Sequence, residues 1–305
     1  MPETLALSLG KLNKSAKQLL NVLSFMAPEK IPLDFFERQR EHLPPPLCED
    51  LRDRLKTIDA VSELTNYSLA MPDGDAYIEV HRIVQEIVRE LLGEEADTDL
   101  LGVCLEAMAA AMPDIDDYGR PEQREWFERI SAHAVEIANR AACNPDKEVR
   151  AASLCFSLGV GFDELAQYEQ ALEWYNKALG IREKVLGAEH PDTAYTYNNI
   201  AIEYYEQCNY PKALEWHQKA LGIREKVLGA EHPDTAATYN NIAVVYRNQG
   251  NYPKALELYH KSYIIGLSKL GATHPDTIAT RKNMEAAYED SGLDGKFDDW
   301  LNSHE

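Results

Sequence analysis

The sequence repeats one block of about twenty residues almost three times. The block begins at Tyr168, Tyr210 and Tyr252, and its first two copies share the string KALGIREKVLG. The tetrapeptide His-Pro-Asp-Thr follows each copy, at His190, His232 and His274, so both steps are 42 residues long. A fixed period in this range is typical of solenoids, whose stacked units present one long surface to a partner. The repeat therefore predicts a binding protein.

Composition narrows the partners that this chain can have. Its 51 acidic and 31 basic residues give 305 residues a formal net charge of −20. Binding to phosphate backbones or anionic membranes needs clustered Lys and Arg, so we expect neither nucleic acid nor membrane partners. No basic segment followed by an apolar run marks a signal peptide, and no apolar run approaches 18 residues.

Cysteine usage indicates a reducing compartment. The five cysteines are Cys48, Cys104, Cys143, Cys155 and Cys208. Their number is odd and no two have C-x-x-C spacing, so we expect reduced thiols and a cytoplasmic protein. No Cys/His set has the spacing of zinc ligands, and we expect no metal and no cofactor.

Each 42-residue unit predicts a pair of helices. Pro191 suits a first helical position, and helix A is expected to run from it to about Gln207. Helix B is expected from about Pro211 to Leu228, with Gly229 as its C-terminal cap. Small residues are expected where helices A and B cross closely: Ala201, Ala213, Ala220, Ala243 and Ala255.

The unit resembles the tetratricopeptide repeat. The resemblance rests on aromatic Tyr197, Tyr204 and Tyr210 and on the small residues Ala201, Ala213 and Ala220. The period, the Asn-Asn pair and the shared strings resemble the kinesin-light-chain subtype over roughly residues 150–291. The end units depart from the pattern: Cys155 and Ser157 replace its aromatic and Asn residues in the first unit, and Arg281 and Lys282 replace Tyr-Asn in the last.

The resemblance implies that helix A lines a concave groove for a peptide. Carried over residue by residue, the groove positions are Tyr195, Asn198, Asn199, Ile202 and Tyr205, then Ala237, Asn240, Asn241, Val244 and Arg247, then Ala279, Lys282, Asn283, Ala286 and Glu289. An Asn amide offers a donor and an acceptor, so it can hold the backbone of an extended peptide. Asn is also unfavourable inside helices, so its presence at the same position of successive repeats suggests a specific role.

Two alternatives stay open for these polar residues. The row Asn199, Asn241 and Asn283 is the better candidate for peptide binding, whereas Asn198 and Asn240 could bond the adjacent helix and set the repeat spacing. The three His-Pro-Asp-Thr histidines are expected to be loop and capping residues and not a metal or catalytic set.

Residues 1–92 are not repetitive. Apolar stripes predict helices over Ser15–Met26 and near Leu33–Phe36, another through Leu47, Leu51, Leu55 and Ile58, and a closing helix from Ile83 to Leu91. Alternation over 67–70 and 77–80, around a Pro72-Asp-Gly turn, predicts a β-hairpin. Three helices with a small hairpin form a winged-helix outline.

This segment resembles the winged helix of NB-ARC-type (STAND) signal-transducing NTPases, by the strings that begin at Leu5, Leu19 and Ile31. His81 falls where that family has a Met-His-Asp motif, which implies a nucleotide-sensing role, although Val80 and Arg82 replace the Met and the Asp. The alternative for His81 is a partly buried histidine at a helix start. The sequence has no G-x-x-x-x-G-K-S/T loop, so either an NTPase domain lies upstream in a longer protein or that domain was lost. The pattern is already under way at Leu5, which favours the longer protein.

We therefore expect a mostly α protein: a winged-helix-like domain at 1–92, a helical connector at 93–145, an α–α superhelix of repeats at 146–291 and a capping helix at 292–305. The expected function is the sensor and scaffold half of a STAND-type signalling switch that binds a protein or peptide. The alternative is a winged-helix DNA-binding regulator with a repeat-based sensor, although Asp73, Asp75 and Glu79 crowd the hairpin. No catalytic set stands out, so we expect no enzyme.

The tail from Lys296 to Glu305 offers two interpretations. Phe297, Trp300 and Leu301 share one helical face and can cap the last repeat. The acidic segment around Trp300 also resembles the cargo peptides of kinesin-light-chain grooves, which implies self-inhibition. We expect the cap.

Overall fold

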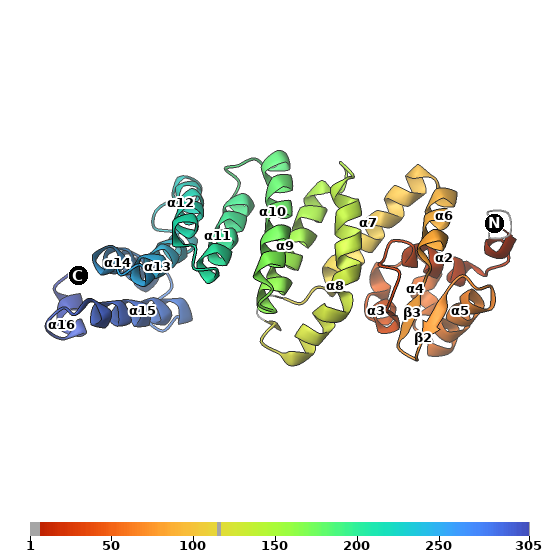
Figure 1. The fold of residues 1–305 in the computed structure, drawn as a ribbon, viewed down its shortest axis with the longest axis horizontal. Helices are drawn as coiled ribbons and strands as arrows, with labels where there is room; N and C mark the ends of the chain where they lie inside the picture. Colours follow the sequence, from red (N-terminus) through yellow and green to blue (C-terminus); the bar gives the residue numbers. More distant parts are fainter. Residues whose placement is uncertain (1–6, 115–116, 305) are drawn as a thin grey trace. The chain divides into compact units, whose positions relative to one another are not determined.

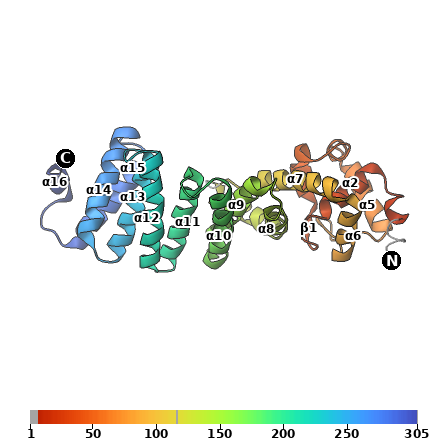
Figure 2. The same cartoon turned by 90° about the horizontal axis from the view of Figure 1, so that it is seen from above.

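The computed structural model describes residues 7–114 and 117–304 (Figure 1). The chain divides into two compact units, 1–181 and 182–305, which we describe separately. Both are built mainly from helices (Figure 2). Leu5, Ala6, part of the acidic loop at 113–121 and Glu305 lie outside the described residues.

The first unit begins with helices around a small sheet. The helices are α2 (Lys14–Leu23), α3 (Leu33–Arg38), η1 (Arg40–His42), α4 (Leu47–Asp50), α5 (Arg54–Asn66) and α6 (Arg82–Leu92). The strands are β1 (Ile31–Pro32), β2 (Met71–Asp73) and β3 (Tyr77–Glu79). The sheet is antiparallel with the order β1-β3-β2, and Ile78 of β3 lies opposite both Ile31 and Pro72. The helices and hairpin of the predicted outline are present, and β1 adds a strand that we did not predict.

Two local predictions in this region were wrong. The stripe from Leu47 to Ile58 is not one helix, because the Asp53 side chain accepts a hydrogen bond from Leu55 N–H and starts α5 anew. As a result, Leu55 and Ile58 are 71% and 50% exposed, and α5 buries Leu64 instead.

The first predicted strand was also misplaced. Residues 67–70 close helix α5, because the Tyr67 and Leu69 N–H groups donate to Glu63 and Leu64 carbonyl oxygens. The strand begins only at Met71.

Four longer helices complete the first unit: α7 (Glu94–Ala111), α8 (Pro121–Ala142), α9 (Glu148–Glu164) and α10 (Tyr168–Val185), the last of which crosses the unit boundary. Trp126 Nε1 donates to the Ala111 carbonyl oxygen at 2.8 Å and joins α8 to α7. Phe127 packs edge-on against Phe162, and a Cβ at Gly161 would overlap the Phe127 ring. The missing side chain therefore lets α8 and α9 approach closely.

The second unit contains the regular helix pairs. They are α11 (Pro191–Glu206) with α12 (Tyr210–Val227), α13 (Pro233–Asn248) with α14 (Tyr252–Lys269), and α15 (Pro275–Ser291) with α16 (Phe297–Asn302). The predicted bounds are confirmed for α11 and α12. The alanines Ala201, Ala213, Ala220, Ala243 and Ala255 are all fully buried, as expected at close helix crossings.

The strings that recur in the sequence join each helix B to the next helix A. Arg182 Nη1 donates to the Asp192 carbonyl oxygen at 3.0 Å and to Thr196 Oγ1 at 2.7 Å. One period later, Arg224 makes the same two bonds, at 2.8 and 2.7 Å, with Asp234 and Thr238. Each guanidinium group is a charged donor, and its hydrogen bonds are largely buried. Such bonds are strong, so they hold consecutive repeats together.

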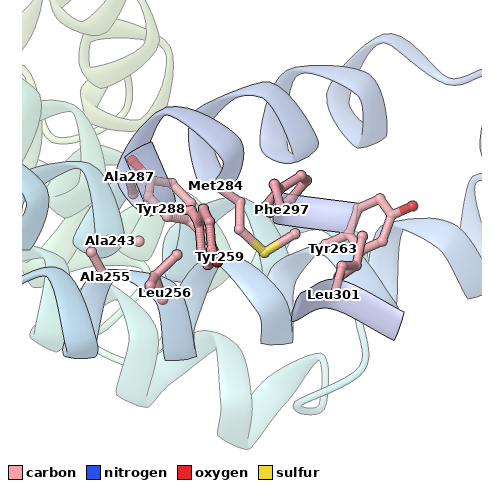
Figure 3. Packing of buried hydrophobic residues seen from close by; sticks show 10 residues of the cluster. All are labelled: Ala243, Ala255, Leu256, Tyr259, Tyr263, Met284, Ala287, Tyr288, Phe297 and Leu301. Atoms are coloured by element: carbon pink, nitrogen blue, oxygen red, sulfur yellow. The ribbon is translucent and has the colours of Figure 1, made fainter. Parts of the chain in front are cut away.

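Helix α16 closes the end of this unit. Phe297 and Leu301 are 7% and 5% exposed and pack with Tyr259, Tyr263 and Met284 of α14 and α15 (Figure 3). Trp300 is partly buried at the edge of the same cluster. The tail therefore lies against the last repeat, in the position expected of a cap.

Candidate peptide-binding face of the repeats

The predicted groove residues all lie on α11, α13 and α15 of the second unit. Tyr195 and Lys282 are exposed, and Asn198 is buried at 7% exposure. The other polar and larger groove residues are half-buried: Asn199, Ile202, Tyr205, Asn240, Asn241, Val244, Arg247 and Asn283. The sequence thus placed its candidates on equivalent helices, and most retain surface for a ligand.

Polar contacts between these helices recur at a spacing of 43 residues, one more than the repeat period. Asn241 Nδ2 donates to Asn198 Oδ1 at 3.2 Å, and Asn283 Nδ2 donates to Asn240 Oδ1 at 3.3 Å. The amides of consecutive repeats are therefore linked along one line. The row that we expected to bind peptide and the row that we expected to set the spacing are joined to each other.

Two further pairs follow the same spacing at the C-terminal ends of the helices. Asn248 Nδ2 donates to the Tyr205 hydroxyl at 2.9 Å, and Arg247 Nε donates to Asp290 Oδ2 at 2.7 Å. Asn248 and Asp290 were missed by the sequence reasoning. The signal that could have found them is a search for polar pairs 43 residues apart.

A buried histidine lies behind Asn198. His217 of α12 is 1% exposed, and its Nδ1 lies 3.1 Å from Asn198 Oδ1. The amide oxygen can only accept, so His217 Nδ1 carries the proton and donates. Burial, with a smaller contribution from the nearby Arg224 charge, lowers the pKa of His217 to about 3. His217 therefore stays neutral, and Asn198 makes the bond to the adjacent helix that the second alternative described.

Asn199 differs from the other amides of the row. Its Nδ2 donates to the Tyr195 carbonyl oxygen one turn earlier in the same helix, at 2.9 Å. This bond stays within α11, so Asn199 contributes no link between repeats. Of the row Asn199, Asn241 and Asn283, Asn199 is therefore the residue whose half-buried side chain makes no hydrogen bond to another repeat.

The other predicted histidines cap helices. In His190, His232 and His274 the Nδ1 atom accepts from the N–H two residues later, at 3.1, 3.1 and 3.3 Å, which confirms the capping role. His81 does the same for α6 by accepting from Ile83 N–H at 3.2 Å, and it is exposed, whereas the alternative to a nucleotide-sensing role had it partly buried. This cap uses Nδ1 of His81 and not its Nε2.

The part of the chain that the structure describes offers little else for chemistry. No group of three His, Cys, Asp or Glu side chains in it could hold a metal ion. Its cysteines are free thiols. None of its helices combines the length and the apolar character needed to cross a membrane.

Comparisons with known proteins agree with the helix pairs. The tetratricopeptide repeat model matches residues 158–226, 204–263 and 234–294. A second family model, a domain of unknown function called DUF7779, matches residues 7–96. Residues 158–294 are therefore tetratricopeptide repeats, a class of helical scaffold that binds other proteins.

One similar protein is much longer than this chain. A "nucleotide-binding leucine-rich repeat (NLR)-like protein" of the fungus Hyaloscypha variabilis is 28% identical over 195 residues, which are 63% of this chain. Those residues are only 18% of that protein, so this chain spans a small part of its relative.

Several solved structures are similar in fold. BtubC (BKLC) of P. vanneervenii is 20% identical with a TM-score of 0.49, over 65% of this chain and 74% of that one. A kinesin-light-chain-like protein of Podosopora anserina is 23% identical with a TM-score of 0.48, over 58% and 83%. A STAND protein with a tetratricopeptide repeat sensor from Pyrococcus horikoshii is 16% identical with a TM-score of 0.41, over 92% and 48%.

Proposed function

We propose that the repeats bind an extended peptide segment of a partner protein along α11, α13 and α15. The observation that carries this proposal is the line of Asn side chains linked from repeat to repeat, Asn198 to Asn241 and Asn240 to Asn283. Side-chain amides at fixed intervals on one face match the repeating N–H and C=O groups of a peptide backbone.

The hydrogen bonds within the line also fix which way the amides face. Asn198 Oδ1 accepts from both His217 and Asn241, so its Nδ2 must face away from these two donors. Each amide is thereby held in one orientation before a ligand arrives. Such preorganisation lowers the entropic cost of binding.

The test begins by selecting peptides from a random display library on the full chain. For a selected peptide we expect Asn199→Ala to weaken binding by about 1–2 kcal/mol, the cost of a lost hydrogen bond in a buried contact. Titration calorimetry measures the affinity, and thermal unfolding checks that the repeats stay folded.

Asn176→Ala is the matched control. Asn176 also donates to the carbonyl oxygen four residues earlier, that of Leu172 at 2.7 Å, but it lies on the helix B α10. Equal effects of the two substitutions on peptide affinity, or no effect of Asn199→Ala, would contradict the proposed face.

We further propose that the chain acts as the sensor and scaffold part of a STAND-type signalling switch and is not itself an enzyme. Two observations support this proposal: the NLR-like relative is named as nucleotide-binding, and this chain matches only 18% of it. In such a switch, an NTPase domain of the same polypeptide would precede residue 1, and His81 Nε2 would face its nucleotide. Sequencing the native transcript upstream of the Met1 codon tests this, because an open reading frame there must encode a phosphate-binding loop.

A further inference from the structure

A pocket lies at the C-terminal end of the repeats, and none of the linked asparagines lines it. It has a volume of about 500 Å³ and lies between α14, the end of α15 and α16. Its walls are mainly apolar and include Tyr252 and Leu256 of α14, Leu293 of the following loop, and Trp300 of α16. Leu293 is 50% exposed, so the rim is open to solvent. This volume is in the range that takes one or two side chains of a ligand.

The repeat period explains why the pocket exists. Phe297 and Trp300 stand 42 residues after Ala255 and Leu258, so α16 occupies the register of another helix B. Helices α12 and α14 are 18 residues long, whereas α16 has six. Phe297 replaces the alanine of the regular repeat, whereas Trp300 stands where two earlier copies also have a tryptophan, Trp174 and Trp216. The rings of Phe297 and Trp300 stack with each other at 6.1 Å. This short, bulky helix covers α14 incompletely and leaves a gap beside Trp300.

The pocket lining holds one carboxylate, that of Glu257, together with the imidazoles of His260 and His304. Glu257 lines it and makes no ion pair with another described residue. The two lysines nearest on α14 are engaged elsewhere: Lys254 lies over the Tyr246 ring at 5.2 Å, and Lys261 donates to the Tyr239 hydroxyl at 2.5 Å. An unpaired carboxylate beside aromatic rings favours a cation, through charge attraction and contact with the ring faces.

We propose that this pocket binds a peptide segment in which an apolar side chain is adjacent to lysine or arginine. The apolar side chain packs against Leu256 and Trp300, and the cation pairs with Glu257. This interaction surface is formed by α14 and α16, so it does not depend on the Asn line of α11, α13 and α15. A partner could occupy both surfaces at once.

The test uses the full chain labelled with 5-fluorotryptophan. The four tryptophans are Trp126, Trp174, Trp216 and Trp300, and the Trp300 resonance is assigned from Trp300→Phe. The probe is the peptide Ac-Gly-Lys-Phe-Lys-Gly-NH2, and its acidic counterpart is Ac-Gly-Glu-Phe-Glu-Gly-NH2. We expect the basic peptide to shift the Trp300 resonance in a saturable way, with the other three unmoved.

Two variants locate the cation. Glu257→Gln should weaken the basic peptide roughly fivefold, as expected for loss of one solvent-exposed ion pair. Glu215→Gln is the matched control, because Glu215 stands one period earlier on α12 and pairs with Lys219 at 2.9 Å. No saturable shift of Trp300, equal shifts with the acidic peptide, or equal effects of the two variants would overturn the proposal.

Discussion

At the residue scale, Asn198 stands at a predicted peptide-binding position, but its side-chain oxygen is used for hydrogen bonds within the protein. Asn198 is 7% exposed, and its oxygen accepts from an amide of the next repeat and from the imidazole of His217. An amide at a groove position suggests contact with a ligand, but the Asn198 oxygen is already occupied by two buried hydrogen bonds. The half-buried Asn241 of the next repeat is then positioned by this buried residue.

His217 is itself an exception within the repeats. Tyr175 and Tyr259 stand one period before and after it. Tyr259 is fully buried, and its hydroxyl has no hydrogen-bond partner among the described residues, whereas the smaller imidazole reaches Asn198. Histidine in place of tyrosine at position 217 therefore adds a hydrogen bond between α12 and α11 in the middle repeat.

This link predicts acid sensitivity. The pKa of His217 falls from 6.5 to about 3 on folding, so the unfolded chain takes up a proton between these pH values and the folded chain does not. Stability is therefore lost as pH falls, by about 2 kcal/mol between pH 7 and pH 5 from this group. His217→Tyr should reduce the difference between unfolding free energies measured in urea at pH 7 and pH 5. An unchanged pH dependence would show that His217 is accessible to protons in the folded chain.

At the element scale, α16 decides how the repeats end. The regular Tyr–Glu hydrogen bond between repeats, seen for Tyr239 with Glu225, is missing at the next step, because Arg281 and Leu267 occupy those positions. Arg281 instead donates to Asp298 of α16 at 2.5 Å and lies over the Phe297 ring at 5.4 Å. The last helix A is thus adapted to a short cap and not to a full helix B.

Deletion of residues 294–305 tests this role. Removing Phe297 and Leu301 uncovers apolar surface on α14 and α15, and each side chain contributes about 1.5–3 kcal/mol by burial. We expect the melting temperature to fall by roughly 5–10 °C and the affinity for a groove peptide to stay the same. Tighter peptide binding with normal melting would instead identify the tail as a self-inhibitor.

At the scale of the whole molecule, charge limits the partners more than shape does. The chain carries a formal net charge of −20. At both proposed binding surfaces, a basic or neutral peptide is therefore favoured over an acidic one. The same charge opposes the phosphate backbone of nucleic acid, whatever the fold of residues 7–96.

We therefore predict no binding of duplex DNA at physiological salt. An electrophoretic mobility-shift assay with the full chain at about 1 μM, where non-specific binders typically begin to bind, should leave the duplex unshifted. A salt-sensitive shift would show that the Lys and Arg side chains form a local basic surface despite the net charge.

Much of the second unit was predictable from its sequence. Helix starts follow from His-Pro-Asp-Thr, because the histidine caps the helix and proline suits its first turn, and helix ends follow from glycines such as Gly229 at φ 95°. These interactions join residues that are close in sequence, so every copy of the repeat that contains the residues can form them. The close crossings at alanine were predictable for the same reason.

Predictions that depended on distant neighbours were less successful. Leu55 and Ile58 fit an apolar stripe, yet the cap at Asp53 turned them to the surface. The carry-over of groove positions placed its candidates on α11, α13 and α15, but it did not show which amides were already bonded.

The sequence by itself determined the period, the helix pairs and the face that carries the asparagines. Only the tertiary structure decided that Asn198 bonds Asn241 and His217, that Arg247 pairs with Asp290, and that α16 leaves a pocket beside Trp300. The reason is physical: contacts within a helix are fixed by its own geometry. Contacts between helices depend on the angle and offset at which neighbouring units pack, and these offsets set the spacing of 43 residues where the sequence repeats every 42.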